Sequence, residues 1–214
     1  MRITVFGAAG NVGSRVVAEA LSRGHEVTAV VRDAARYPEL HPAATHRTGD
    51  AENPYSIAEL STDQDLVINA TRPAQGREHE HAAVAKSLLE GLAGTGVRLL
   101  IVGGAGSLTV PGTQGVLAID DPTYVPTAWR HMAQASNDQY EAVRTADTDV
   151  DWTYVSPSAV LEPGTRTGTF RLGLDELLVD ETNNSSISME DLATALLDEA
   201  ETPRHVRTRF TAGY

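Results

Sequence analysis

The stretch Met1 to Asp33, MRITVFGAAGNVGSRVVAEALSRGHEVTAVVRD, decides the fold. An apolar run from Arg2 to Phe6 is followed at once by a glycine-rich turn and then by apolar residues at helical spacing, which end at Gly24. A second apolar run, Val27 to Val31, completes a unit of roughly 30 residues. A strand, a glycine turn, a helix and a parallel strand in this order predict the first half of a dinucleotide-binding sheet.

The three glycines of the turn, Gly7, Gly10 and Gly13, have separate physical reasons. Gly7 lets the chain turn off the strand, Gly10 lets the backbone approach a pyrophosphate, and Gly13 lets the helix pack tightly on the sheet. The anion would lie on free N–H groups at the helix N-terminus. Because strand, helix and second strand stand where this motif requires them, we predict a cofactor site formed by Gly7, Ala9, Gly10, Asn11, Val12 and Gly13.

The residue that leaves the second strand, Arg32, bears on which dinucleotide binds. An acidic residue at this place holds the ribose 2′-OH of NAD, whereas the 2′-phosphate of NADP needs a cation. The planar guanidinium of Arg32 suits a phosphate, and Arg36 follows one helical turn later. The sequence therefore predicts NADP(H) rather than NAD(H). The alternative is that Arg32 is only a solvated residue after a strand. The neighbouring Asp33 also weakens the prediction of NADP(H).

The composition describes a chain of 214 residues with 41% apolar residues, which predicts one domain with a full core. No run of about 18 apolar residues is present, and Met1 leads directly into a strand without a secretory leader, so we expect a cytoplasmic protein. The 17 basic and 29 acidic residues give a net charge of −12, which disfavours nucleic acid and anionic membranes. The expected partner is a small-molecule substrate. The chain itself is expected to be a monomer or a homodimer. Without cysteine, thiol catalysis and zinc–thiolate sites are excluded.

The alternation of strands and helices continues along the chain. Apolar runs predict strands at Thr45 to Thr48, Asp65 to Ala70, Arg98 to Val102, Asp151 to Val155 and Thr208 to Thr211. Helical patterns fill the intervals at residues 54–60, 79–92, 127–146 and 189–199. Residues 164–173 are expected to be a hairpin or an extended segment. These elements predict an α/β fold: one domain over 1–214, a Rossmann doubly wound parallel sheet with a small C-terminal substrate lobe over about residues 159–188.

Residues at the carboxyl ends of the later strands are further candidates, because open α/β sheets bind ligands at that edge. Asp50 and Ala51 follow the third strand, where an adenine would lie, although Asp50 reads equally well as a turn residue. The fifth strand runs into a glycine cluster, so its backbone passes close to a neighbour. The predicted cofactor contacts at this edge are Asp50, Ala51, Ala70, Thr71, Arg72 and Gly103.

Two histidines, His79 and His81, alternate with glutamates at the start of the third helix. Residues at i and i+2 point apart on a helix, and no third ligand with suitable spacing is evident. We therefore expect a solvated helix start here and no metal site.

Taken together, these motifs resemble an atypical short-chain dehydrogenase/reductase. They are GAAGNVG at 7–13, VVRD at 30–33, GD at 49–50, INAT at 68–71, VGGAGSL at 102–108 and DWTYVSPS at 151–158. Over essentially its whole length the chain is similar to the NAD(P)H-binding group that includes NmrA-like proteins and the biliverdin and flavin reductase relatives. The resemblance implies an NAD(P) cofactor, but this group mixes reductases, isomerases and cofactor-sensing proteins without turnover.

The resemblance also implies a catalytic serine, and a tyrosine with a lysine four residues later. Ser107 matches the serine, and a role as a plain turn residue fits it equally well. Tyr140 has arginine at the lysine position, and arginine cannot be deprotonated. Counting back from the 151–155 strand, the family's pair falls near Ala133 and Asn137, about two turns before Tyr140, so the usual pair is absent. Tyr140 and His131 remain candidate proton donors. The alternative for each is a purely structural role.

Three functions follow from these residues. The first is an NADPH-dependent reductase of a small carbonyl, quinone, flavin or related conjugated substrate, with Ser107 positioning the substrate. The second is a non-catalytic NADP(H)-sensing regulator, which the absent tyrosine and lysine favour. An NAD(P)-dependent isomerase or epimerase is the third. Some relatives transfer hydride directly while solvent supplies the proton, so catalysis without the usual pair is chemically sound.

Overall fold

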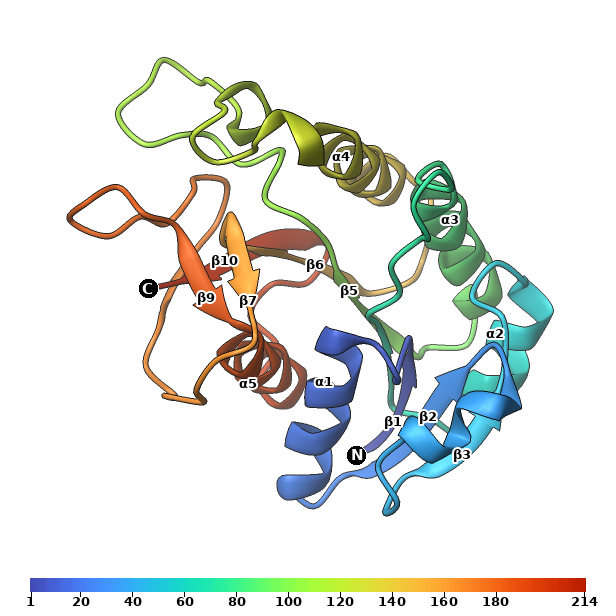
Figure 1. Cartoon of the computed structure of the whole chain (residues 1–214). Helices are drawn as coiled ribbons and strands as arrows, with labels where there is room; N and C mark the ends of the chain where they lie inside the picture. Colours follow the sequence, from blue (N-terminus) through green and yellow to red (C-terminus); the bar gives the residue numbers. More distant parts are fainter.

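The computed structural model describes all residues from 1 to 214. It has one large sheet in which seven strands are parallel and an eighth is antiparallel at one edge (Figure 1). The strands are β1 (Arg2–Phe6), β2 (Glu26–Val31), β3 (Thr45–Thr48), β4 (Leu66–Asn69), β5 (Arg98–Val102), β6 (Trp152–Pro157), β8 (Arg171–Gly173) and β10 (Thr208–Gly213). Their order in the sheet is β3-β2-β1-β4-β5-β6-β10-β8. The predicted doubly wound parallel sheet is confirmed.

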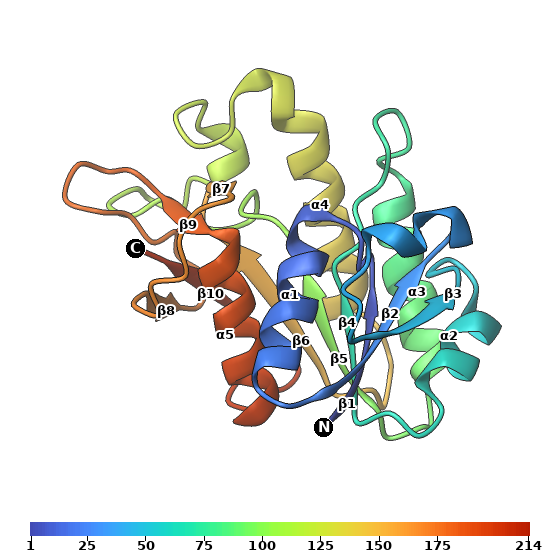
Figure 2. The ribbon, with the colours of Figure 1, turned by 60° about the horizontal axis from the view of Figure 1, so that its bottom comes forward.

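Helices cover both faces of the sheet (Figures 1 and 2). On one face lie α1 (Asn11–Ser22) and α5 (Met189–Glu201). On the other lie α2 (Pro54–Ser61), α3 (Glu80–Leu92) and α4 (Arg130–Arg144). Short 3-10 helices are η1 (Ala34–Glu39), η2 (Ala118–Asp120) and η3 (Thr127–Trp129). Because the central strands are covered on both faces, β4 and β5 are almost entirely buried, as their continuous apolar sequence predicts.

Side-chain caps set the start of several helices. The carboxamide oxygen of Asn53 accepts from the N–H of Tyr55, and Pro54 opens α2. The hydroxyl of Ser188 accepts from the N–H of Asp191 at the start of α5. These caps satisfy N–H groups that have no partner inside a helix.

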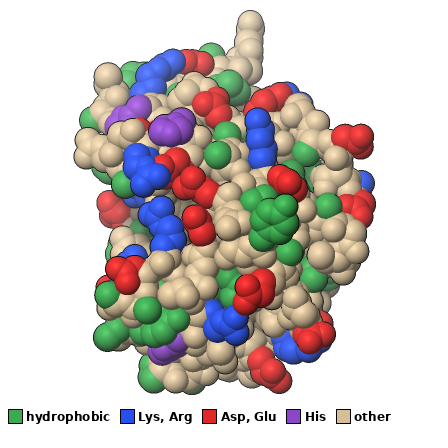
Figure 3. Space-filling model, turned by 90° about the vertical axis from the view of Figure 1, so that its right-hand side faces the viewer, with side chains coloured by type: hydrophobic (Ala, Val, Ile, Leu, Met, Phe, Trp, Pro, Cys, Tyr) green, Lys and Arg blue, Asp and Glu red, His purple; other side chains and the backbone are tan.

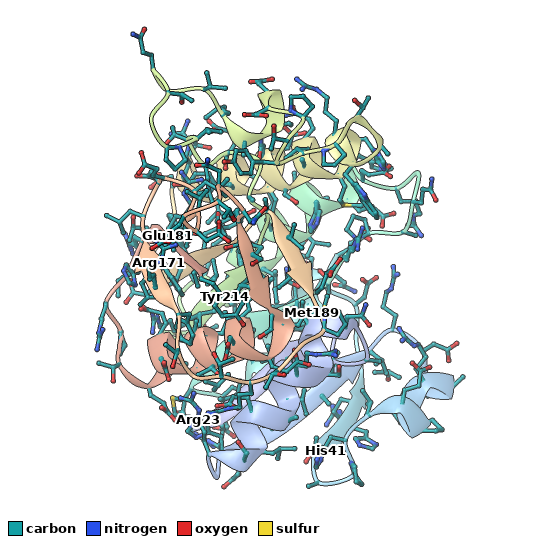
Figure 4. All side chains as sticks on the ribbon, turned by 60° about the vertical axis from the view of Figure 1, so that its left-hand side comes forward. Arg23, His41, Arg171, Glu181, Met189 and Tyr214 are labelled. Carbon is teal, nitrogen blue, oxygen red and sulfur yellow. The ribbon has the colours of Figure 1, made fainter.

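The C-terminal lobe consists of short strands joined by extended segments. The strands β7 (Val160–Glu162) and β9 (Ser186–Ser188) pair to form a separate small sheet. The segment 164–173 is extended rather than a hairpin, and its β8 pairs with β10 of the main sheet. Tyr214 lies over the start of α5, near Met189, and its carbonyl oxygen accepts from Arg171 (Figure 4). The lobe is thus tied to the main sheet by the C-terminal strand.

Charge is mixed over the surface that carries β3, α2 and α3. Acidic and basic side chains are interspersed there (Figure 3). The net charge of −12 therefore forms no continuous acidic field over this face. None of the helices has the length and apolar character that spanning a bilayer requires.

Candidate functional site

A cleft of about 1040 Å³ follows the carboxyl ends of the parallel strands. The loops after β1 to β6 all contribute to its wall, together with the start of α3, one face of α4 and the C-terminal lobe. Pockets for single drug-sized ligands hold roughly 300 to 1,000 Å³. This cleft is slightly larger than that range, so it has room for a large extended ligand or for two ligands side by side.

The glycine loop after β1 leaves no room for a side chain at Gly7 or at Gly13. Gly7 has φ of +78°, and a Cβ there would lie 2.6 Å from the carbonyl oxygen of Ala70 on the neighbouring strand end. A Cβ on Gly13 would lie 2.1 Å from the carbonyl oxygen of Gly7. The loop is therefore held tightly between α1 and the end of β4, and its backbone faces the cleft.

Helix α1 begins at this loop with its N–H groups free. Its N-cap residue is Gly10, which offers no side chain, and its first turn holds no acidic residue. Ser14 is the first residue whose N–H bonds back, to the carbonyl oxygen of Gly10, so the N–H groups of Asn11 and Val12 have no partner. An uncapped helix N-terminus that opens into a cleft is a binding site for an anion such as a phosphate.

The end of β2 places two arginines at the rim of the cleft. Arg32 is exposed and forms no ion pair, whereas Arg36 pairs with Glu39 at 2.7 Å and donates to the carbonyl oxygen of Ala9 at 3.1 Å. The carboxylate of Asp33 caps η1 by accepting from the N–H of Ala35. Asp33 is thus engaged in its own turn, and Arg32 is the side chain left free for a ligand.

The ends of β3 and β4 complete this half of the cleft. The carboxylate of Asp50 accepts from the N–H of Glu52 in its own turn, which agrees with the turn reading of Asp50. Asn69 is fully buried, and its side-chain oxygen accepts from both the N–H and the hydroxyl of Thr71. This fixes Thr71 at the cleft wall. Every residue predicted to contact the cofactor lines the cleft except Gly13, which packs behind Gly7.

The other half of the cleft is largely apolar. The segment before α4 and the first turns of that helix meet the C-terminal lobe across it. Trp129 stands at the mouth, where the guanidinium carbon of Arg72 lies 5.4 Å from its ring centroid. The apolar residues that line this half are Tyr124, Val125, Pro126, Trp129, Met132, Val160, Leu161 and Met189.

The three predicted catalytic residues do not line the cleft. The hydroxyl of Ser107 accepts from Arg209 at 2.7 Å, and the same guanidinium lies 4.4 Å from the ring centroid of Tyr140. The structure thus brings Ser107 and Tyr140 together, but around Arg209 rather than around the cleft. His131 is half-exposed, and its Nε2 lies 3.4 Å from a carboxylate oxygen of Glu78.

The glycine cluster after β5 packs closely against other parts of the protein and also lines the cleft. A Cβ on Gly103 would lie 2.0 Å from the ring of Tyr154, and one on Gly106 would lie 2.7 Å from the side-chain oxygen of Asn137. The face of α4 beside this loop presents Met132, Ala133 and Ser136 to the cleft. No side chain able to donate a proton therefore stands where the resemblance places the tyrosine.

His81 corrects the expectation of a solvated helix start. Its neighbour His79 is exposed, but His81 and Glu80 are buried and line the cleft. The signal was present in the sequence, because the buried face of this helix repeats at i+3 and i+4 from His81 through Val84, Ala85, Leu88 and Leu92. The interleaved charges at the helix start concealed it.

Comparisons with known proteins agree with this geometry. The profile of a family described as NAD(P)H-binding matches residues 7–203. A structure of a provisionally named exported protein from Burkholderia pseudomallei is 41% identical, covers 100% of both chains and has a TM-score of 0.88. A provisionally named epimerase from Bacteroides thetaiotaomicron is 36% identical over 100% of this chain and 96% of its own, with a TM-score of 0.87.

A third structure, a provisionally named NADH-flavin reductase from Streptococcus pneumoniae TIGR4, is 32% identical. It covers 100% of this chain and 99% of its own, with a TM-score of 0.89. The glycine cradle, the free N-terminus of α1 and the unpaired arginine fit the nucleotide that the family binds. The chain therefore belongs to the NAD(P)H-binding family, within the atypical short-chain dehydrogenase/reductases of Rossmann fold.

Proposed function

We propose that the protein is an NADPH-dependent reductase of small, flat, conjugated acceptors such as quinones and flavins. The observation that carries this proposal is the contrast between the two halves of the cleft. One half has a phosphate cradle and a free arginine, and the other is mainly apolar and aromatic and has Ala133 where the resemblance places the catalytic tyrosine. A dinucleotide and a planar second ligand match these halves.

Each residue has a role in the proposed reaction. The N–H groups of Asn11 and Val12 hold the diphosphate, and Arg32 holds the 2′-phosphate. The apolar half, with Trp129 at its mouth, stacks the acceptor. When bound, NADPH supplies a hydride to the acceptor. Because Ala133 offers no acid, the proton comes from solvent, which suits acceptors that delocalise the negative charge better than simple aldehydes.

The experiment that tests the proposal is NADPH oxidation across a panel of acceptors. Quinones and free flavins are expected to be reduced at least about tenfold faster than simple aldehydes, since only aldehydes need an enzyme acid at the carbonyl oxygen. Faster aldehyde reduction would contradict the solvent-proton mechanism. Tight NADPH binding without reduction of any acceptor would contradict the proposal that the protein is an enzyme.

Replacing Arg32 is expected to change the cofactor preference. Arg32→Ser removes the free guanidinium, and a charge-assisted hydrogen bond to a phosphate contributes about 1.5–3 kcal/mol. The dissociation constant for NADPH should therefore rise by about 10- to 100-fold, and that for NADH should hardly change. Calorimetric titration with both cofactors measures this.

The matched control for Arg32 is Arg47→Ser. Arg47 is also exposed, but it pairs with Glu59 and lies outside the cleft. It should leave both affinities unchanged. Equal affinity of the wild-type protein for NADH and NADPH would disprove the role of Arg32.

Replacing Trp129 is expected to affect the acceptor and not the cofactor. Trp129→Ala removes a large aromatic wall that is 55% exposed at the mouth of the cleft. An aromatic pair contributes about 0.5–1.5 kcal/mol beyond the area it buries. We expect kcat/KM for a quinone to fall by about tenfold with an unchanged dissociation constant for NADPH.

The control for Trp129 is Tyr55→Ala, since Tyr55 is 87% exposed and does not line the cleft. It should leave both quantities as they are. A fall in NADPH affinity in Trp129→Ala would show that this half of the cleft holds part of the cofactor instead of the acceptor.

A non-catalytic NADP(H)-sensing protein is the second candidate. It is favoured by one observation, the engagement of Ser107 and Tyr140 by Arg209, which leaves the cleft without the family's polar catalytic groups. One relative is called an NADH-flavin reductase, which favours the reductase, and another is called an epimerase, which favours the third function. The acceptor panel separates the two candidates.

A further inference from the structure

His81 is a buried histidine in the wall of the cleft for which the reductase mechanism has no role. It is the second residue of α3, and only 6% of it is exposed. Its ring forms no hydrogen bond within the protein, and Nδ1 is completely enclosed without a partner. His81 lines the cleft together with Arg72 and Glu80.

The state of the ring makes this arrangement unusual. Burial and the positive charge of Arg72 lower the pKa of His81 to about 4, so the imidazole is neutral at neutral pH. A neutral imidazole has one N–H to donate and one nitrogen to accept, and leaving the enclosed Nδ1 without a partner is costly. A phenylalanine would fill the same space without that cost. Protein stability alone does not account for a histidine here.

The position of His81 relates it to the phosphate cradle. The glycine loop packs directly on the end of β4, as the 2.6 Å distance between a Gly7 Cβ and the Ala70 carbonyl oxygen shows. From there the chain continues through Thr71 to Arg72, and Arg72 is close enough to influence the ring of His81. A ligand whose diphosphate lies on the N-terminus of α1 therefore has His81 in the facing wall of the cleft.

The next turn of α3 indicates which part of the dinucleotide lies beside His81. Val84 lies one turn after His81 and lines the cleft as well, as does Ala51 from the end of β3, where the adenine is expected. His81 belongs to the first turn of α3, which directly follows in the chain the loop after β4. This places the imidazole beyond the adenine end, beside the middle of an extended dinucleotide.

We propose that His81 is a cofactor-binding residue that donates a hydrogen bond to the diphosphate of the bound dinucleotide. The proposal rests on the cofactor site of the proposed reductase and adds to it a residue outside the glycine loop. The diphosphate oxygen carries no proton, so the neutral ring of His81 contacts it as a donor, through its N–H. It does not depend on turnover.

The test compares three ligands in the full-length protein by calorimetry and competition. NADPH and 2′-phospho-ADP-ribose contain the diphosphate, whereas 2′-AMP keeps the adenosine and the 2′-phosphate but has no diphosphate. His81→Phe should weaken the first two by about tenfold, which is about 1.4 kcal/mol, and leave 2′-AMP unchanged. His81→Gln, which retains an N–H donor, should recover most of the loss. His79→Phe is the control, because His79 is exposed and lies outside the cleft.

Thermal unfolding without ligand gives a second readout. Removing an unpaired buried nitrogen should raise the melting temperature of His81→Phe by about 2–4 °C, while its NADPH affinity falls. Should this variant fold poorly, His81→Gln and His81→Met, which are similar in size and differ in the donor, provide the same comparison.

The outcomes distinguish this proposal from the proposed function. His81→Phe binding all three ligands like the wild type would overturn the proposal and leave the reductase intact. An equal loss for 2′-AMP would also overturn it, by assigning His81 to the adenosine. If His81→Phe weakens only the two ligands that contain the diphosphate, and no acceptor is turned over, the role of His81 is supported and the reductase is disproved. A wild-type protein that does not bind NADPH would disprove both.

Discussion

Gly13→Ala is expected to abolish measurable NADPH binding and to lower the free energy of unfolding by about 3 kcal/mol. In an ordinary helix this substitution stabilises, because glycine is about 1 kcal/mol less favourable than alanine there. Here the new Cβ would lie 2.1 Å from the carbonyl oxygen of Gly7 and 2.8 Å from its carbonyl carbon. Both atoms belong to the backbone, so no side chain can rotate away. Helix α1 has to move off the loop, and the phosphate cradle moves with it.

A matched control separates this steric effect from backbone strain. Gly24 ends the turn after α1 with φ of +80°, and a Cβ there would meet no atom within 4 Å. Gly24→Ala should therefore cost only about 1–2 kcal/mol, from the left-handed conformation, and leave NADPH binding intact. Chemical denaturation and calorimetric titration measure both effects. Normal binding and stability in Gly13→Ala would contradict the close packing of α1 on the loop.

The same close packing explains how far the sequence predicts the fold and the cofactor half of the cleft. Gly7 and Gly13 sit in a short local motif, and the strand and helix on either side of it are strongly periodic. Once the strands are known to be parallel, their carboxyl ends must share one edge. Residues as far apart in the chain as Arg32, Thr71 and Gly103 could therefore be assigned to one cleft, and the structure places them there.

The positions of the predicted catalytic side chains depend on long-range contacts that no local pattern reveals. Ser107 is held by Arg209 of β10, which is separated from it by about half of the chain. The buried guanidinium also pairs with Asp175 and lies against the ring of Tyr140. A resemblance transfers a residue type to a position, but it says nothing of a partner that turns the hydroxyl away from the cleft.

The start of α5 shows the same division between local and long-range structure. The sequence predicts the cap at Ser188 from a serine followed by acidic residues, and its hydroxyl does cap the helix. It does not predict what surrounds Asp191, which is completely buried. The carboxylate of Asp191 accepts four hydrogen bonds, from the N–H and hydroxyl of Thr167, the N–H of Gly168 and the hydroxyl of Tyr214. It therefore joins the 164–173 segment and the C-terminus to α5.

Asp191→Ala is expected to lower the free energy of unfolding by about 4 kcal/mol at pH 7, because it removes a completely buried carboxylate and leaves its four donors without their acceptor. The exposed Asp198 on the same helix, which pairs with Arg23, is the control, and Asp198→Ala should cost no more than about 1 kcal/mol. Urea denaturation of both variants and the wild type measures these differences. A loss in Asp191→Ala no larger than that of the control would contradict the role of the buried carboxylate.

The effect of Asp191 on stability should also depend on pH in a defined direction. Burial by itself raises the pKa of this carboxyl, but its hydrogen bonds to Thr167, Gly168 and Tyr214 outweigh burial and hold the pKa below its ordinary value of 3.8. A group whose pKa is lower in the folded state stabilises the protein above its unfolded pKa and loses that contribution as the pH falls through the folded value. The difference in stability between the wild type and Asp191→Ala should therefore be constant from pH 7 to about pH 5 and shrink below pH 3.8. Other buried carboxylates with lowered pKa values, Glu19 and Glu199, titrate in both proteins, so their contribution cancels in the difference. A difference that grows as the pH falls would mean that the protonated form of Asp191 is the one that the surrounding donors stabilise.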